Sequence, residues 1–325
     1  MNAEALRTVK VRAPTRLDLG GGWTDVPPYC EEEGGFVCNI AIARYATATV
    51  AADSAGGLAA NAGADSHAPA DAALVRAACR RARVEGVRVT IESDFPVNAG
   101  LGGSSAASAA LLGAFAVWRG EPWHHCEIAE EGRRIEVEEL GIAGGRQDHY
   151  AATHGGALAL TFSDRVELRR IALSAHTRAE FERRAILLYT GESRISGSNI
   201  TEVVRAYRNR EERVIVALGR MRALAEQIAA VLEAGDLDGA GTLMGEHWEH
   251  QRALHPAIPT PLIDEIVRRA AGAGALGSKA MGASGGGCVL VIAGAGAVER
   301  VRAAIAPLGS MVPFTLDAGG LARCD

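Results

Sequence analysis

The sequence predicts an α+β fold with two layered halves. Segments with strand-like and helix-like periodicity follow one another in irregular order, and no strict strand–helix–strand alternation runs through the chain. A length of 325 residues can build one large domain or two ordinary ones. Because the pattern changes near residues 170–185, we expect domains at residues 1–175 and 176–325.

In the first half, strands are predicted where apolar side chains alternate, and helices where they recur every three to four residues. The expected strands are Val9–Asp18, Gly35–Val50, Val87–Ser93, Gly155–Phe162 and Val166–Ile171. The expected helices are Ala72–Val84, Ala106–Trp118 and Glu127–Leu140. Residues 53–71 are rich in Ala, Gly and Asp, which predicts a surface loop.

The second half follows the same rules but is richer in helix. The expected strands are Ala185–Tyr189, Gly286–Ala293 and Met311–Leu316. The expected helices are Asn199–Ala234, Asp236–His250, Thr260–Ala273 and Gly296–Ala306. No internal repeat is visible in either half.

The composition is typical of a soluble globular enzyme, with 48% hydrophobic and 22% charged residues. The net charge is −5, and the chain has no basic block that would predict nucleic-acid binding. Residues 1–10 lack the apolar core of a signal peptide, and no uninterrupted apolar run reaches the ~18 residues of a membrane span. We therefore expect a cytoplasmic protein with no nucleic-acid or membrane partner.

Cysteine and histidine spacing gives little support for a metal site. No two of the six cysteines form a C-x-x-C pair, which favours reduced, structural thiols. His247 and His250 stand three residues apart on an expected helix, a spacing that two metal ligands can share. Since no third ligand lies nearby in the sequence, substrate contact or a surface position is the favoured alternative.

Residues 96–108 contain the most informative local feature, a glycine- and serine-rich loop between an expected strand and an expected helix. Glycines let backbone N–H groups approach an anion, and a helix N-terminus adds about half a positive charge. A serine hydroxyl can face a Mg²⁺ that bridges phosphates. The loop lacks the Gly-Lys-Ser/Thr of a Walker A loop and the third glycine of a dinucleotide fingerprint. It predicts a phosphate cradle, with a plain tight turn as the alternative.

Two further glycine-rich segments, Arg12–Asp25 and Lys279–Cys288, accompany this loop. The three motifs, in this order and at these separations, resemble the GHMP superfamily of sugar and mevalonate kinases over nearly the whole chain. The resemblance implies an N-terminal domain like domain 2 of ribosomal protein S5 and a ferredoxin-like C-terminal domain. It also implies ATP and Mg²⁺ as cofactors.

The resemblance assigns a nucleotide-binding set to the second and third motifs. These residues are Gly100, Leu101, Gly102, Gly103, Ser104, Ser105 and Ala106, together with Gly285 and Gly286. The implied Mg²⁺ ligands are Ser105 and Glu136, since related sugar kinases place a metal-binding glutamate twelve residues before the position of Asp148. Glu138 and Glu139 are close enough to compete, and a solvated helix face is the alternative.

The resemblance assigns catalysis to Asp148 and Arg16. In the family, an Asp in a Gly-x-x-Asp-Gln-type segment faces the acceptor hydroxyl, and here His149 replaces the usual amide. A carboxylate at hydrogen-bond distance can orient a hydroxyl and accept its proton. An arginine nearby would keep that carboxylate ionised and stabilise charge on the entering oxygen. The alternatives are a solvated turn aspartate and an ordinary salt bridge.

The expected substrate residues are Gly22, Trp23, Thr24 and Asp25, with Arg194 as a candidate for a substrate phosphate. An inter-domain loop contact is an equal alternative for Arg194. Galactokinases carry a Glu at the position of Gly22, so glycine would open space and argues against galactose. Trp23 would offer an apolar plane to the sugar.

The implied activity is ATP-dependent phosphorylation of the anomeric hydroxyl of a sugar. The segment Gly20–Tyr29 resembles L-fucose kinases, whereas Gln147–Tyr150 and Thr190–Ser196 are similar both to those and to glycero-manno-heptose 7-phosphate kinases. Because of Trp23 we favour a free sugar such as L-fucose, with heptose 7-phosphate as the alternative. Two other classes stay open: a catalytically silent sugar- or nucleotide-binding relative, and an NAD-dependent oxidoreductase. A homodimer is possible.

Overall fold

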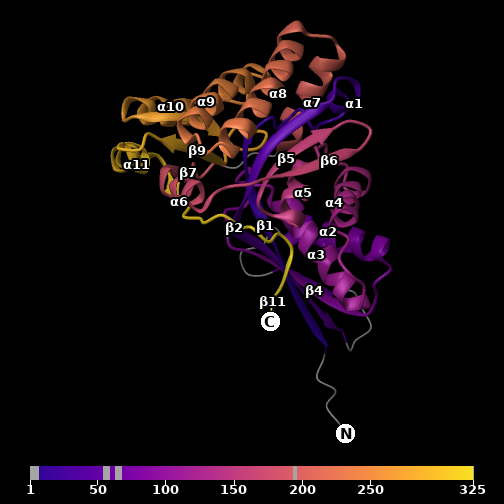
Figure 1. The fold of residues 1–325 in the computed structure, drawn as a ribbon. Coiled ribbons are helices and arrows are strands. Elements are labelled where there is room, and N and C mark those ends of the chain that lie inside the picture. The colour runs from indigo at the N-terminus through magenta and orange to yellow at the C-terminus, as the bar shows by residue number, and fades with distance from the viewer. Residues whose placement is uncertain (1–6, 54–58, 63–67, 193–195, 325) are drawn as a thin grey trace.

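The computed structural model describes residues 7–53, 59–62, 68–192 and 196–324, and it confirms the α+β class (Figure 1). The described residues form two β-sheets, each with its own group of helices. The helices between residues 68 and 154 gather beside the first sheet, and those between residues 196 and 272 gather in the upper part of the view.

The first sheet is built around the long, bent strand β2. Strand β2 pairs antiparallel with β1, β4 and β5, and Arg16 in β1 lies opposite Ala41. The strands in this sheet are β1 (Thr8–Gly20), β2 (Gly35–Ala52), β3 (Ala59–Ala62), β4 (Val87–Ser93), β5 (Ala157–Phe162), β6 (Val166–Ile171) and β11 (Ala322–Cys324). Strand β1 ends at Gly20, the first residue of the segment Gly20–Asp25, which we call the sugar loop after the role that the sequence predicts for it.

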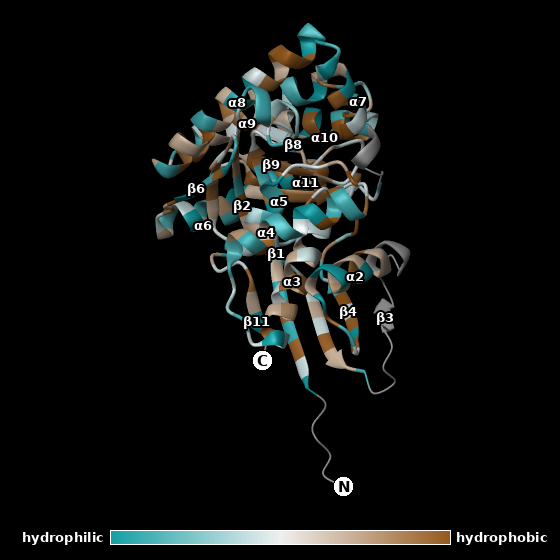
Figure 2. Ribbon diagram, turned by 90° about the vertical axis from the view of Figure 1, so that its right-hand side faces the viewer, coloured by the Kyte–Doolittle hydropathy of each residue, from teal (hydrophilic) through white to brown (hydrophobic). Residues whose placement is uncertain are grey.

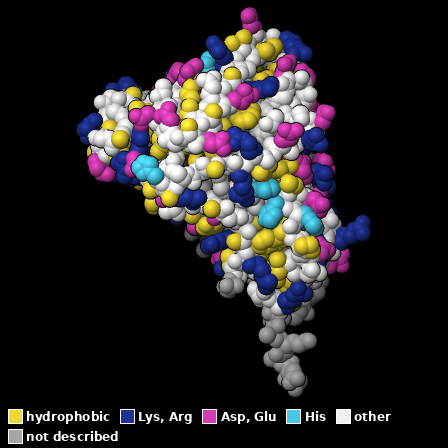
Figure 3. All heavy atoms as spheres, in the orientation of Figure 1, with side chains coloured by type: hydrophobic (Ala, Val, Ile, Leu, Met, Phe, Trp, Pro, Cys, Tyr) yellow, Lys and Arg dark blue, Asp and Glu magenta, His cyan; other side chains and the backbone are white. Residues whose placement is uncertain are grey.

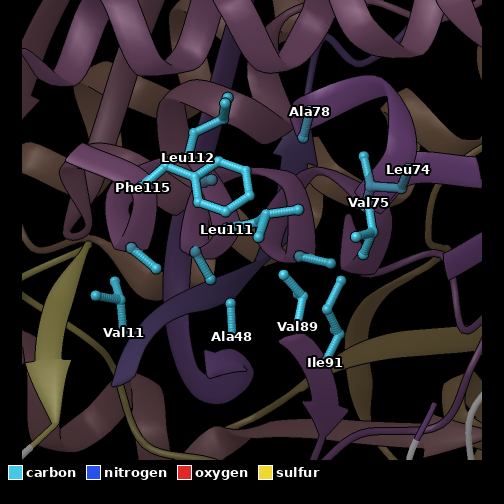
Figure 4. Packing of buried hydrophobic residues seen from close by; sticks show 14 of the residues in the cluster. Val11, Ala48, Leu74, Val75, Ala78, Val89, Ile91, Leu111, Leu112 and Phe115 are labelled. Atoms are coloured by element: carbon cyan, nitrogen blue, oxygen red, sulfur yellow. The ribbon is translucent and has the colours of Figure 1, made fainter. Parts of the chain in front are cut away.

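Helices α2 (Ala68–Ala82) and α3 (Gly103–Arg119) cover this sheet (Figure 4). Leu111 and Phe115 of α3 lie above Val89 and Ala48 of the strands, and all four side chains are buried. The many alanines of α3 let the helix approach the sheet closely. This packing holds the N-terminus of α3 at the end of the preceding glycine loop.

Four shorter elements complete the first half: α1 (Tyr29–Glu32), α4 (His125–Arg134), the π-helix η1 (Ile135–Glu139) and α5 (Gln147–His154). The expected helix Glu127–Leu140 is therefore an α-helix that continues into a π-helical turn. Helix α5 was not predicted, because its short amphipathic pattern is weak. It places Asp148 in its first turn rather than in a loop.

The second sheet is antiparallel, in the order β10-β7-β9-β8. Its strands are β7 (Ala185–Tyr189), β8 (Ala275–Ala280), β9 (Cys288–Ala293) and β10 (Ser310–Met311). The helices of this half are α6 (Ala175–Arg184), α7 (Ser196–Arg208), α8 (Glu212–Glu233), α9 (Leu237–Ala253), α10 (Pro261–Gly272) and α11 (Val298–Ile305), followed by the 3-10 turn η2 (Ala306–Leu308). Figure 2 shows the apolar colouring of β9 inside this half and the hydrophilic colouring of much of α4.

Two expectations for the second half need correction. The long helix expected over Asn199–Ala234 is two helices, broken at Arg210, whose φ of 57° lies outside the helical region. The final strand expected at Met311–Leu316 ends at Met311. The chain then returns to the first sheet, where β11 pairs with β1. A division at 175/176 therefore stays a proposal, since residues 322–324 belong to the first sheet.

Residues 53–71, expected to form a loop, contain β3 and the beginning of α2 among the positions that the structure describes. No helix in the described part of the chain is long and apolar enough to cross a membrane. On the face shown in Figure 3, basic and acidic side chains of the described residues are interspersed rather than separated by sign.

Candidate active site

Arg16 and Asp148 form a bidentate ion pair at the centre of the molecule. Arg16 Nε donates to Asp148 Oδ1 at 2.7 Å, and Nη2 donates to Oδ2 at 2.8 Å. Arg16 is buried in β1, whereas 27% of the Asp148 side chain is exposed. Arg16 Nη1 also donates to the carbonyl oxygen of Gly100 at 2.6 Å. One guanidinium therefore joins three segments: the first glycine motif, Asp148, and the loop of residues 96–102. We call residues 96–102 the phosphate loop, after the role that the sequence predicts for it.

The phosphate loop ends against the same carboxylate. Gly102 adopts a left-handed conformation, with φ of 75°, and caps helix α3. A Cβ on Gly102 would lie 3.2 Å from the Asp148 carboxyl group. The first N–H groups of a helix have no intrahelical acceptor and can bind an anion. An anion bound there would lie beside the Asp148 carboxylate.

The expected nucleotide residues divide into lining and supporting positions. Ser104 is exposed in the first turn of α3, and Gly102 and Gly103 are partly exposed. Leu101 is buried in the apolar core, and the Ala106 N–H donates to the Gly102 carbonyl at 2.9 Å. Leu101 and Ala106 thus shape the loop through the backbone.

The third glycine motif packs against this loop. We call Gly282–Gly287 the C-terminal glycine loop. A Cβ on Gly100 would lie 2.6 Å from the Met281 carbonyl oxygen, and one on Gly282 would lie 2.9 Å from the Gly100 Cα atom. The Gly285 N–H donates to the Ile258 carbonyl, and a Cβ on Gly286 would lie 2.7 Å from the Glu192 carbonyl oxygen. Glycine is required here because backbone meets backbone.

Ser105, Glu136 and His149 form a buried polar cluster below the loop. Ser105 Oγ donates to Glu136 Oε1 at 3.3 Å, and His149 Nε2 lies 3.3 Å from Glu136 Oε2. Burial would raise the pKa of Glu136, but the charge of His149 holds it below its usual value. Burial would lower the pKa of His149, but Glu136 raises it.

A hydroxyl and a carboxylate are hard oxygen donors of the kind that Mg²⁺ prefers, and Mg²⁺ usually completes its shell with phosphates and water. The Ser105–Glu136 pair therefore fits the metal that the sequence implies. Among the described residues, no three His, Cys, Asp or Glu side chains gather as a self-sufficient metal site. Bound phosphate would have to supply part of the shell.

The sugar loop is held by its own polar side chains. Thr24 Oγ1 donates to the Gly21 carbonyl at 2.7 Å and accepts from the Phe36 N–H at 3.1 Å. Asp25 Oδ2 accepts from the N–H groups of Arg146 and Gln147 at 2.8 and 2.9 Å. Asp25 therefore binds the start of α5, directly before Asp148.

Gly22 and Trp23 do not lie as the sequence suggested. A Cβ on Gly22 would lie 2.3 Å from Asp18 Oδ2 and 2.8 Å from Gln147 Nε2, so the expected open space is already filled. Trp23 has a positive φ of 85°, and only 7% of it is exposed. Its ring packs in the core of the second half with Tyr29. Trp23 therefore does not offer a free plane for a sugar to stack on. Arg194 lies outside the described residues.

Comparison with known proteins agrees with this arrangement. The family model for the GHMP kinases N terminal domain matches residues 51–156, and the model for the GHMP kinases C terminal domain matches residues 224–308. The chain belongs to the GHMP kinase family. It is therefore a kinase, an ATP-using enzyme that transfers a phosphoryl group to a hydroxyl.

Relatives of this GHMP kinase include two kinds of sugar kinase. It is 27% identical over 301 residues to D-glycero-alpha-D-manno-heptose 7-phosphate kinase of Campylobacter jejuni, covering 87% of this chain and 88% of that protein. It is 27% identical over 336 residues to L-fucokinase/L-fucose-1-P guanylyltransferase of Bacteroides fragilis, covering 87% of this chain but only 34% of that protein.

A solved structure matches over almost the whole kinase. This is the crystal structure of a D-glycero-D-manno-heptose 1-phosphate kinase from Bacteroides thetaiotaomicron, with a TM-score of 0.78 and 26% identity. The match covers 98% of this chain and 99% of that one. The two-domain GHMP kinase fold expected from the motifs is thereby confirmed.

The sequence did not reveal one buried network in this kinase. Lys279 Nζ donates to Asp18 Oδ2 at 2.5 Å and to the Asp18 carbonyl at 2.9 Å, and both side chains are buried. Burial would raise the pKa of Asp18, but the Lys279 ammonium lowers it below its usual value. Asp18 and Lys279 each lie within a glycine-rich motif that the sequence showed, but nothing in the sequence indicated that the two side chains form a pair.

Proposed function

We propose that this GHMP kinase transfers the γ-phosphoryl group of ATP to the anomeric hydroxyl of a sugar, and that the sugar is a heptose 7-phosphate. The observation that carries the kinase site is the place of the Asp148 carboxyl group, 3.2 Å from where a Cβ on Gly102 would lie, at the N-terminus of α3. A sugar hydroxyl on Asp148 would meet a phosphoryl group held by the loop.

The reaction assigns a role to each described group. Asp148 orients the O1–H group and accepts its proton as the new O1–P bond forms and the bond between the γ-phosphorus and the β–γ bridging oxygen breaks. Arg16 holds the Asp148 carboxylate through two hydrogen bonds. When bound, Mg²⁺ would be held by Ser105 and Glu136 and would spread the negative charge of the phosphates.

Two observations favour a heptose 7-phosphate over free L-fucose. The argument for a free 6-deoxy sugar depended on an accessible Trp23 ring, and that ring is packed in the core. In addition, a solved heptose 1-phosphate kinase structure matches 98% of this chain with a TM-score of 0.78, and the heptose 7-phosphate kinase relative matches 87% of it. L-fucose remains the second candidate, because Gly20–Tyr29 resembles fucose kinases.

The test is an ADP-release assay with ATP and Mg²⁺ on a panel of D-glycero-D-manno-heptose 7-phosphate, L-fucose, D-mannose and D-galactose. We expect heptose 7-phosphate to give the highest kcat/KM, with phosphorus NMR showing a new anomeric phosphate. Preference for L-fucose would overturn the substrate assignment. Binding of ATP without turnover of any sugar would instead favour the catalytically silent alternative.

A second arm tests Arg194 as the phosphate contact expected from the sequence. If the substrate is phosphorylated and Arg194 binds it, Arg194→Ala raises KM for heptose 7-phosphate by about tenfold or more, the loss of a hydrogen bond to a charged group. KM for ATP serves as the internal control. An unchanged KM for heptose 7-phosphate would remove Arg194 from the substrate site.

A further inference from the structure

Helix α9 contacts the sugar loop through His247. The Gly21 N–H donates to His247 Nε2 at 2.8 Å, and the imidazole is fully buried. Burial and the neighbouring Lys279 charge lower the pKa of His247 to about 3. The ring is therefore neutral near pH 7, with its proton on Nδ1, and can accept this hydrogen bond throughout the ordinary working range.

One helical turn later, α9 contacts the C-terminal glycine loop through Gln251. Gln251 Nε2 donates to the Gly282 carbonyl at 3.2 Å and to Ser284 Oγ at 3.1 Å. Gln251 is also fully buried. Since residues four apart lie on the same face of a helix, His247 and Gln251 form one polar stripe directed at two different loops.

The position of α9 is fixed by very close packing on β8. A Cβ on Gly277 of β8 would lie 1.9 Å from the Gly241 carbonyl oxygen and 2.8 Å from the Gly245 nitrogen. No side chain fits between these backbones, so α9 has little freedom to shift along the strand. Strand β8 leads through Lys279 into the C-terminal glycine loop.

The two loops are also joined where they begin. Asp18, two residues before the sugar loop, forms the buried ion pair with Lys279, three residues before the C-terminal glycine loop. Asp18 Oδ1 also accepts from the Gly22 N–H at 3.3 Å. The ion pair thus sets the start of each loop, and α9 adds one hydrogen-bonding side chain to the interior of each. Thr24 and Asp25 also hold the first loop, and Asn199 donates to the Ala283 carbonyl of the second at 3.1 Å.

We propose that α9 is the positioning helix of this kinase, with His247 determining the geometry of the sugar loop and Gln251 that of the C-terminal glycine loop. This inference rests on the proposed function and on the sequence prediction that the first loop serves sugar binding and the second nucleotide binding. The first loop would act on the sugar site through Asp25, which holds the start of α5 and hence Asp148. Removal of the His247 acceptor leaves a buried Gly21 N–H without a partner, so the loop must rearrange to satisfy it. Removal of the Gln251 amide leaves the Gly282 carbonyl and the Ser284 hydroxyl of the other loop without that donor.

The test is a crossed pair of variants, His247→Leu and Gln251→Met, each replacing a buried polar side chain with an apolar one. We expect His247→Leu to raise KM for the sugar by about tenfold and to leave KM for ATP within about twofold. We expect the reverse for Gln251→Met. His247→Gln, whose amide oxygen can accept from Gly21, should restore KM for the sugar. Ile305→Ala in α11, a fully buried apolar side chain outside both loops, controls for lowered stability.

Amide hydrogen exchange gives a readout that does not need turnover. His247→Leu should speed exchange in peptides covering residues 20–25, and Gln251→Met in peptides covering residues 282–287, with little change in the other loop. Equal effects of both variants on both loops and both KM values, matching Ile305→Ala, would show a merely structural role and overturn the inference. Unchanged exchange and KM would also overturn it. If wild type turns over no sugar, the proposed function fails, and exchange alone still decides the role of α9.

Discussion

The Arg16 guanidinium holds the Asp148 carboxylate with two hydrogen bonds of 2.7 and 2.8 Å, although the two residues stand 132 positions apart. The pair leaves part of the carboxylate exposed beside the N-terminus of α3. A carboxylate held in one orientation can receive a hydroxyl proton without first reorganising.

Replacement of Asp148 by Asn should lower kcat by about 10²–10⁴-fold, because an amide cannot accept the hydroxyl proton. ATP should still bind, since the phosphate loop does not depend on that charge. Coupled ADP release measures kcat, and a thermal shift with ATP and Mg²⁺ measures binding. Asp164→Asn, in the exposed turn between β5 and β6, is the matched control. Near-normal kcat in a folded Asp148→Asn protein would remove Asp148 from catalysis.

Ser105→Ala and Glu136→Gln should each raise the Mg²⁺ concentration that gives half-maximal activity. Because the two side chains are in contact at 3.3 Å and are assigned to one ion, their effects should be strongly non-additive. A Mg²⁺ titration of both single variants and the double variant measures the coupling. Glu138→Gln, on the exposed side of the same π-helical turn, should behave like wild type. Independent effects that simply multiply would contradict a shared ion.

The buried Asp25 carboxyl should make stability depend on pH. Burial raises its pKa from 3.8 to about 6, so between these values the folded state holds a proton that the unfolded state has lost. This extra proton stabilises the folded state at low pH, and the stabilisation is lost as pH rises through about 6. Asp25→Asn keeps an oxygen acceptor for α5 but does not titrate.

From pH 5 to pH 7, the free energy of unfolding of Asp25→Asn should therefore rise relative to wild type by about 1 kcal/mol. Urea unfolding at several pH values measures this difference. The contributions of titrating groups that both proteins share cancel in it. A constant difference across this range would show that Asp25 does not carry a raised pKa.

Replacing one member of the Lys279–Asp18 pair should lower the free energy of unfolding strongly, whereas replacing both members should lower it little. Lys279→Met leaves a buried carboxylate without its partner, which commonly costs about 3–5 kcal/mol. Asp18→Asn combined with Lys279→Met removes both charges and should recover most of that loss. Chemical unfolding of Lys279→Met, Asp18→Asn and the double variant tests this. If the double variant is as unstable as Lys279→Met, the charge pair is not the source of the cost.

Several features of this kinase followed from local sequence because their causes are local. Apolar alternation correctly predicted β4 at Val87–Ser93, and the alanine-rich run predicted most of α3. The glycine motifs indicated the family, because backbone approach to an anion requires glycine wherever it occurs. The roles of individual site residues, by contrast, stay predictions.

The rest depended on contacts between distant segments. Trp23 stands among glycines and polar residues, which predicts an exposed loop, yet its ring is buried in the core of the second half. Strand β11 lies at the opposite end of the chain from its partner β1. No local pattern in residues 322–324 distinguishes this strand from a loop.

The sequence by itself determined the α+β class, the GHMP resemblance and the candidate site residues, since periodicity and glycine chemistry act over a few residues. Only the tertiary structure decided that Asp18 meets Lys279 across 261 positions and that His247 accepts from Gly21. It also decided that Asp25 holds the start of α5. Each of these contacts exists because packing removes polar groups from water, and a buried polar group must then find its partner wherever the fold brings one.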